Sequence, residues 1–254
     1  MYFKNTHIDF SQVDDIESIK ELIIHNCDIS NFSCISAAKN LKEIVMVECN
    51  IAVEDLSCLK EMEKLKELRF RGMKMGSILW MSEIPSLKNL ALIEINDIDY
   101  SELEYLPNLL RLYIEQADVP SFDFLKKLKK LHTFELDMVP VNNLDFLYDL
   151  PKLKEFRMSY RTADEKALFC ISNMKYLQSF LYPVRDISIY KDCPKIKYIG
   201  LDGSIIHKFK VLKGKDSITS VFFFNCSSQR YFERESAKAK NYLNLTSCGY
   251  GHKI

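Results

Sequence analysis

The sequence predicts an α/β fold built from repeats, in which a parallel β-sheet is covered on one side by short helices and turns. The first observation behind this prediction is a recurring spacing of apolar residues at offsets 0, 3, 5, 8 and 10. The repeats start at positions 19, 41, 65, 87, 109, 131, 153, 177, 196, 218 and 240, and seven of the ten intervals are 22 residues long. The second observation is the composition of the 254 residues, 47% hydrophobic and 28% charged, which is typical of a folded chain.

Each repeat is expected to contribute one strand at offsets 2 to 6. In the third repeat, for example, Leu68 and Phe70 occupy offsets 3 and 5. Because side chains alternate along an extended segment, these two point to the same side, and offsets 2, 4 and 6 point to the other. One segment is too short to bury its apolar side alone. Neighbouring repeats are therefore expected to stack and share one core.

The part of each repeat that follows the strand is expected to return along the outer side as a short helix or turn. Residues 122–128 (FDFLKKL) and 144–151 (LDFLYDLP) show the pattern. Their Phe and Leu side chains can cover the core while lysines and aspartates stay in water. These segments predict the convex side of the molecule.

The two ends of the chain depart from the repeat, as caps of a repeat array must. We expect a single domain over residues 1–254, with an N-terminal cap or degenerate repeat at 1–18 and about ten repeats over 19–228. Residues 229–254 are expected to form a C-terminal cap, with a helix over 229–240 and a half repeat. In that half repeat, Leu243, Leu245 and Cys248 would take offsets 3, 5 and 8.

The spacing resembles the leucine-rich repeat, Leu-x-x-Leu-x-Leu-x-x-(Asn/Cys)-x-Leu, in the short 22-residue class of internalins and phosphatase-regulatory arrays. The resemblance extends over residues 16–248. It implies a right-handed solenoid with a parallel sheet on the concave side and short helices or turns on the convex side. Most copies carry Cys, Met, Ile, Ala or Val at offset 8 where the family has Asn. This departure leaves open how the polar groups of that turn are satisfied.

The eight cysteines are predicted to be small buried residues with reduced thiols. Four of them occupy offset 8 and four lie on the return segments at offsets 15 to 17: Cys27, Cys49, Cys226 and Cys248, and Cys34, Cys58, Cys170 and Cys193. Two chemical alternatives stay open. His25 and Cys27 could form a nucleophilic pair, or Cys226, Cys248 and His252 could bind zinc.

The sequence contains no motif for catalysis or for phosphate binding, and no paired Cys-x-x-Cys spacing. We therefore expect no enzyme activity, no catalytic residue, no metal and no cofactor. Lys and Arg number 35, as do Asp and Glu, so net charge does not favour nucleic acid or a membrane surface. The first residues lack the features of a secretory signal, which predicts a cytoplasmic protein.

The concave face is the candidate binding surface. Three acidic residues at offset 2, Glu21, Glu43 and Glu67, form a row of like charges that the preceding lysines, Lys20, Lys42 and Lys66, are expected to relieve. A mixed centre of Arg, Tyr and carboxylates lies farther along, where some charges should pair, for instance Glu135 with Arg157. Apolar residues follow near the end, where Phe222 and Phe224 are either exposed or covered by the C-terminal cap. The partner-binding candidates are Arg69, Arg71, Arg111, Tyr113, Glu115, Glu135, Asp137, Arg157, Leu181, Phe222 and Phe224.

These features predict a non-catalytic module that binds another protein on its concave face. An alternative rests on resemblance alone. Small bacterial proteins made almost wholly of such repeats are similar to immunity proteins that neutralise a toxin delivered by a neighbouring cell. In that case Glu115, Glu135 and Asp137 could cover a basic toxin surface. An enzyme would need a separate catalytic domain, and the repeats leave no room for one.

Overall fold

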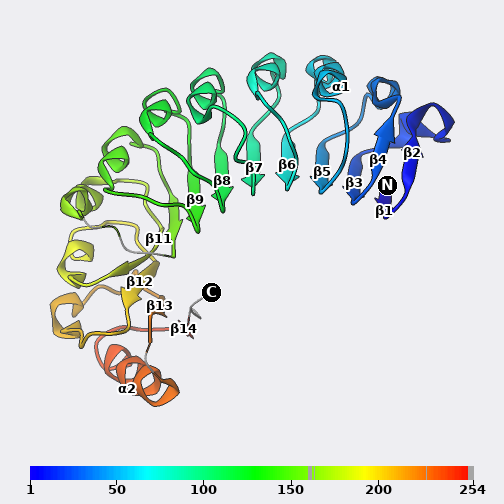
Figure 1. Cartoon of the computed structure of the whole chain (residues 1–254). Helices are drawn as coiled ribbons and strands as arrows, with labels where there is room; N and C mark the ends of the chain where they lie inside the picture. The colour runs from blue at the N-terminus through cyan, green and yellow to red at the C-terminus, as the bar shows by residue number, and fades with distance from the viewer. Residues whose placement is uncertain (160–161, 163, 227, 251–254) are drawn as a thin grey trace. The chain divides into compact units, whose positions relative to one another are not determined.

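The computed structural model describes residues 1–159, 162, 164–226 and 228–250, and it divides into two compact units, Met1–Leu131 and His132–Ile254 (Figure 1). We call them unit 1 and unit 2 and describe each by itself. The single-domain organisation expected from the sequence stays a prediction.

Unit 1 contains a parallel sheet whose neighbouring strands follow the order of the repeats (Figure 1). Its strands are β1 (Tyr2–Lys4), β3 (Glu21–His25), β5 (Glu43–Val47), β6 (Glu67–Arg71), β7 (Asn89–Ile93) and β8 (Arg111–Glu115). A second, two-stranded sheet pairs β2 (His7–Asp9) with β4 (Asp28–Ser30). The N-terminal segment thus adds one strand to each sheet and forms a degenerate repeat.

The return segments of unit 1 are single turns of helix, most of them of the 3-10 type. They are η1 (Phe10–Gln12), η2 (Ile16–Ser18), η3 (Phe32–Ala37), α1 (Val53–Leu56), η4 (Ser57–Glu61), η5 (Leu79–Glu83), η6 (Tyr100–Tyr105) and η7 (Asp123–Lys126). All lie on the side of the sheet that holds the core (Figure 1). We call this the turn side, and the opposite face of the sheet the open face.

The core of unit 1 lies between the sheet and the turns, at the offsets that the sequence predicts. The residues at offset 3, Leu22, Ile44, Leu68, Leu90 and Leu112, occupy matching register positions on neighbouring strands and are buried. Offset 5 forms a second buried row, Ile24, Met46, Phe70, Leu92 and Ile114. The assignment of these two offsets to the core is confirmed.

The turn after each strand explains how the chain manages without Asn at offset 8. The residue at offset 7 adopts the left-handed conformation, with φ of 53° at Glu48 and 60° at Gly72. Its backbone N–H donates to the next repeat, from Glu48 to the Arg71 carbonyl at 2.8 Å. One place later, the Cys49 thiol donates to the carbonyls of Ile24 and Val47, each at 3.4 Å. Backbone and thiol donors thus satisfy groups that an Asn amide would otherwise bind.

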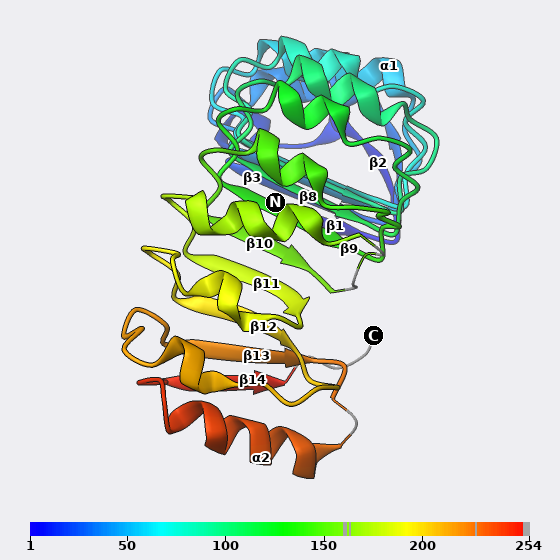
Figure 2. The same cartoon turned by 90° about the vertical axis from the view of Figure 1, so that its left-hand side faces the viewer.

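Unit 2 repeats the arrangement with the strands β9 (Thr133–Asp137), β10 (Glu155–Met158), β11 (Ser179–Val184), β12 (Tyr198–Asp202), β13 (Ser220–Phe224) and β14 (Ser247–Tyr250) (Figure 2). Its turns are η8 (Asp145–Asp149), η9 (Lys166–Asn173), η10 (Ile187–Tyr190) and η11 (Phe209–Leu212), and its last helix is α2 (Gln229–Lys240). The helix expected over residues 229–240 is confirmed.

The position of the last strand differs from the sequence prediction. Ser247, Cys248 and Gly249 pair with Ser220, Val221 and Phe222. Cys248 therefore takes offset 3 and not offset 8. The physical reason is the length of α2, which runs to Lys240 and moves the start of the last repeat from 240 to 245.

Aromatic side chains dominate the core of unit 2. The Phe156 ring lies 6.1 Å from Phe134, 6.0 Å from Phe146 and 5.2 Å from Phe180, measured between ring centroids. Phe134, Phe156 and Phe180 are almost completely buried. At the end of the unit, the Phe232 ring of α2 contacts Phe223 at 5.8 Å. The helix thus covers the core side of β13.

All eight cysteines are free thiols. Cys27, Cys49 and Cys193 are buried, whereas the other five are half-buried, which corrects the expectation that all are fully inside. The reason is that single 3-10 turns cover the core incompletely. Within the part of the chain that the structure describes, every helix is too short or too polar to cross a bilayer.

Candidate functional site

The predicted site is divided between the open faces of the two units. Arg69, Arg71, Arg111, Tyr113 and Glu115 lie on unit 1, and Glu135, Asp137, Arg157, Leu181, Phe222 and Phe224 lie on unit 2. Each of the five residues on unit 1 belongs to one of two strands, β6 or β8, with β7 between them. The structure therefore brings together two smaller sets, and each has its own geometry.

On unit 1, an apolar strip separates the arginines from Tyr113 and Glu115. The register places Ala91 between Arg69 and Tyr113. Ile93 likewise lies between Arg71 and Glu115. Ala91 and Ile93 are each only 7% exposed, although both are on the open face, because the longer side chains on either side cover them. We call these seven residues, Arg69, Arg71, Ala91, Ile93, Arg111, Tyr113 and Glu115, the central patch.

Two of the three arginines in the central patch form ion pairs. Arg69 lies 3.1 Å from Glu67 in its own strand. Arg71 donates to Glu94 at 2.7 Å, and this hydrogen bond raises the pKa of Arg71. The Tyr113 hydroxyl donates to Glu115. These contacts orient the side chains of the patch before any partner binds.

Arg111 differs from the other two arginines. It is exposed at the offset-2 position of β8, and it makes no ion pair with any residue that the structure describes. Its register neighbour on β7 is Asn89, whose side-chain amide already donates to Glu67 at 3.1 Å. The Arg111 guanidinium can therefore bind an external carboxylate without breaking an internal ion pair.

The acidic row on unit 1 is present, but lysines do not relieve it as the sequence suggested. Glu21, Glu43 and Glu67 lie side by side on β3, β5 and β6. Burial raises the pKa of Glu43, and the neighbouring carboxylates of Glu67 and Glu21 raise it further. The cation that opposes them is Arg69, because it points along the same face as the row.

On unit 2, the polar candidates are adjacent but unpaired with each other. Glu135, Arg157 and Leu181 occupy matching positions on β9, β10 and β11. The ion pair expected between Glu135 and Arg157 is absent from the contacts of these two described side chains, so that prediction is wrong. Arg157 is exposed and extends into solvent, where pairing would gain little. Asp137 is half-buried at the end of the same strand.

Phe222 and Phe224 are half-buried on the open face, and α2 does not cover them. Each ring lies on a glycine of a neighbouring strand. A Cβ on Gly200 would lie 2.8 Å from the Phe224 ring, and a Cβ on Gly249 would collide with the Phe222 ring. One ring therefore lies toward β12 and the other toward β14. The two glycines leave a ring-sized space on each side of β13.

The sequence analysis missed a charged contact near the end of unit 2. Asp202 occupies offset 6 and was expected to face outward, yet it is only 2% exposed. Burial raises its pKa, but hydrogen bonds from Ser204 and the guanidinium of Arg185 outweigh this and lower it overall. Arg185 Nε lies 3.0 Å from the carboxylate. An irregular register between β11 and β12 produces this burial, and only the short interval of 19 residues signals it in the sequence.

The thiols show no sign of nucleophilic activation. Cys27 donates to the backbone carbonyl of His25 at 3.2 Å, which is not a contact with the imidazole. Burial raises the pKa of Cys226 to about 11, so its thiol is protonated at neutral pH. Among the described residues, no cluster of His, Cys, Asp and Glu has the arrangement of a metal site. His252, the third residue of the zinc alternative, lies outside the described residues.

Comparisons with known proteins identify the fold. No protein-family model and no curated protein matches the sequence. Among solved structures, the chain is similar to an internalin, InlF, of Listeria monocytogenes, with 16% sequence identity, a TM-score of 0.63, and coverage of 93% of this chain and 75% of that one. It is also similar to internalin C2 of the same species, with 20% identity, a TM-score of 0.50, and coverage of 93% and 83%.

These similarities confirm the predicted fold class. The chain has the leucine-rich-repeat fold of the internalins, with a parallel sheet and short return turns. At such low identity the likeness concerns the fold, so the binding residues must be argued from this chain alone.

Proposed function

We propose that the chain is a protein-binding module and that a protein partner binds the open face of unit 1 over the central patch. The observation that carries the proposal is the environment of Arg111. This exposed arginine lacks an ion pair among the described residues and lies in the same strand as Tyr113. Arg and Tyr around a small desolvated apolar area are the typical composition of a binding hot spot.

The two faces of the sheet support the same proposal. The core-facing offsets carry uniform apolar residues, as the array requires. The open face instead carries arginines, a tyrosine, carboxylates and two nearly buried apolar residues within three neighbouring strands. Packing does not require this chemical variety, and recognition of a specific partner does.

The test is affinity capture with the purified chain, identification of the bound protein, and repetition with the purified partner and variants. We expect the double variant Arg111→Glu, Tyr113→Ala to weaken binding by about a hundredfold, since both hot-spot side chains are lost. The matched control is Lys74→Glu, Tyr105→Ala, which changes the same residue classes at exposed positions outside the open face. Equal binding by the two variants would show that the partner does not use the central patch.

We also propose a more specific candidate, an immunity protein that neutralises a basic toxin domain. The acidic row of Glu21, Glu43 and Glu67 supports it, because adjacent carboxylates that raise the pKa of Glu43 repel one another in the free protein. A cationic partner would relieve this repulsion on binding. Unit 1 as a whole is acidic, with 22 Asp and Glu against 16 Lys and Arg in residues 1–131.

The immunity proposal is tested by co-expression with toxin genes found next to the gene for this chain. Rescue of growth is expected, and the triple variant Glu21→Gln, Glu43→Gln, Glu67→Gln should lose it. A control triple variant, Glu54→Gln, Glu61→Gln, Glu63→Gln, neutralises as many exposed carboxylates outside the row and should rescue normally. Failure of the wild-type chain to rescue any neighbouring toxin would refute this candidate and leave the general binding proposal untouched.

A further inference from the structure

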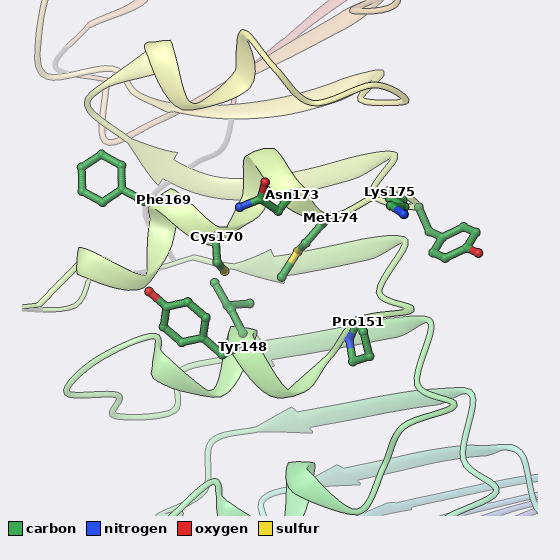
Figure 3. Close-up of a pocket in the computed structure, with 9 residues that line it drawn as sticks. Tyr148, Pro151, Phe169, Cys170, Asn173, Met174 and Lys175 are labelled. Atoms are coloured by element: carbon green, nitrogen blue, oxygen red, sulfur yellow. The ribbon is translucent and has the colours of Figure 1, made fainter.

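The turn side of unit 2 contains a hollow of about 700 Å³ between η8 and η9 (Figure 3). Its walls are largely apolar or aromatic and include Tyr148, Pro151, Phe169, Met174 and Tyr176. Figure 3 shows Tyr148 and Phe169 at one end, with Met174 in the middle. The hollow is separate from the open face, so the proposed function does not account for it.

The size of the hollow follows from the repeat length. The repeat that starts at 153 has 24 residues, and its turn η9 spans 8 residues, from Lys166 to Asn173. In unit 1, where the repeats that start at 65 and 87 meet, the hollow beside Pro85 and Tyr105 has a volume of only about 40 Å³. The extra length of η9 thus opens a space that closes elsewhere in the same fold.

The aromatic side chains around the hollow are unusually exposed. Phe169 is 70% exposed, Tyr148 62% and Tyr176 46%. Isolated exposed apolar residues need no explanation, but a group around one concave site indicates a contact with another molecule. Covering these rings would remove apolar surface from water and stabilise the complex.

The charge around the hollow is positive. Lys175 lines it, and the Lys195 ammonium lies over the Tyr176 ring, 5.2 Å from its centroid. None of the described residues that line it is acidic. The surrounding unit carries 19 Lys and Arg against 13 Asp and Glu in residues 132–254. Asn173 adds an exposed amide that can both donate to and accept from a peptide backbone.

We propose that this hollow is a second binding site, and that it docks an acidic peptide segment of a partner protein through an aromatic or aliphatic anchor. The anchor side chain enters between Phe169 and Met174. Carboxylates of the segment pair with Lys175 and Lys195, and Asn173 binds the peptide backbone. Charge complementarity selects an acidic segment, and the exposed rings select one with an apolar residue.

The experiment measures fluorescence anisotropy of a short labelled peptide, rich in Asp and Glu with one central Phe, titrated with the full chain. Phe169→Ala and Lys175→Glu should each weaken binding by about tenfold, since each removes one anchor of the site. The matched controls, Tyr105→Ala and Lys213→Glu, change an exposed aromatic and an exposed lysine elsewhere and should leave the affinity unchanged. Circular dichroism verifies that all four variants are folded.

Three results would overturn the proposal. The first is equal binding by the Phe169→Ala variant and the wild type. The second is equal binding of a peptide in which Gly replaces the central Phe, or complete competition by a DNA oligonucleotide, because either would indicate general polyanion binding. The third is self-association in sedimentation velocity that Phe169→Ala abolishes, because the hollow would then be an interface between copies. The Arg111→Glu, Tyr113→Ala variant should bind the peptide normally, which separates this site from the proposed function.

Discussion

At the scale of single residues, the left-handed turn at offset 7 is the most demanding position of the repeat. Side chains other than Gly rarely adopt a positive φ, yet this chain places Asn26, Glu48, Glu94, Gln116, Met138 and Asn225 there. The conformation persists because the N–H of offset 7 donates to the next repeat, as from Glu94 to Glu115 at 2.9 Å. A hydrogen bond between repeats therefore compensates a local strain within each repeat.

Glu48→Gly should raise the free energy of unfolding by about 1 kcal/mol, since Gly adopts φ of 53° without strain and keeps the N–H. Gly72→Ala should lower it by about 1–2 kcal/mol, because the new Cβ meets both a positive φ and the Glu48 Cγ at 3.2 Å. Urea unfolding measures both. The control Glu63→Gly lies at a negative φ and should destabilise; stabilisation there would contradict the explanation.

His207 connects stability to pH. Its Nε2 lies 2.8 Å from the Asp202 carbonyl, so this nitrogen must carry the proton. Burial lowers the pKa of His207, against the opposing effects of the Asp202 carbonyl and the carboxylates of Glu235 and Asp202. The unfolded chain therefore takes up this proton at a higher pH than the folded chain, which means that protonation favours unfolding.

From this we expect the free energy of unfolding to be level above pH about 6.5, the ordinary histidine pKa, and to fall as the pH is lowered below it. The variant His207→Gln should be less stable at neutral pH but should lack this part of the slope. Urea unfolding between neutral pH and pH about 5, above the ordinary carboxyl range, measures it. An unchanged slope in the variant would assign the effect to another group.

At the scale of elements, small changes in repeat length determine where functional features arise. The extra residues before 177 lengthen η9 and open the hollow beside Phe169. The helix α2 delays β14, so that Gly249 lies next to Phe222. In each case an insertion keeps the core offsets in place and changes only what covers them. The array tolerates this because each repeat contacts mainly its neighbours.

Gly249→Ala should lower the free energy of unfolding by about 1–3 kcal/mol, because the added methyl group collides with the Phe222 ring. The cost should largely disappear in a Phe222→Ala background, where the ring is absent. A double-mutant cycle measured by thermal unfolding gives the coupling. Additive effects of the two substitutions would show that the ring does not occupy this position.

At the scale of the whole molecule, a neutral chain consists of two units with opposite charge. Residues 1–131 have a formal net charge of −6 and residues 132–254 of +6, from 16 basic and 22 acidic residues in the first and 19 and 13 in the second. Overall neutrality therefore does not exclude electrostatic steering, because a partner meets one unit at a time within a Debye length of about 8 Å at physiological salt. The acidic row and the basic hollow lie on the units whose net charge they share.

The division into two units predicts a local response to core mutations. Phe156→Ala should cost about 3–5 kcal/mol by removing a ring from the aromatic core of unit 2. Amide hydrogen exchange should increase mainly in residues 132–254. The matched variant Leu90→Ala in unit 1 should show the reverse distribution. Equal increases in both units for either variant would mean that the chain unfolds as one cooperative body.

The sequence by itself determined the strands, the two core offsets and the helix over residues 229–240. These follow from alternation and stacking, in which burial of each apolar side chain contributes about 1.5–3 kcal/mol and leaves one consistent register. The tertiary structure decided which charges pair: Arg69 binds Glu67, whereas Glu135 and Arg157 stay apart. Surface ion pairs contribute at most about 1 kcal/mol, so spacing in the sequence does not select among them. The hollow beside Phe169 also depended on the tertiary structure, because its volume is the space left between two turns of unequal length.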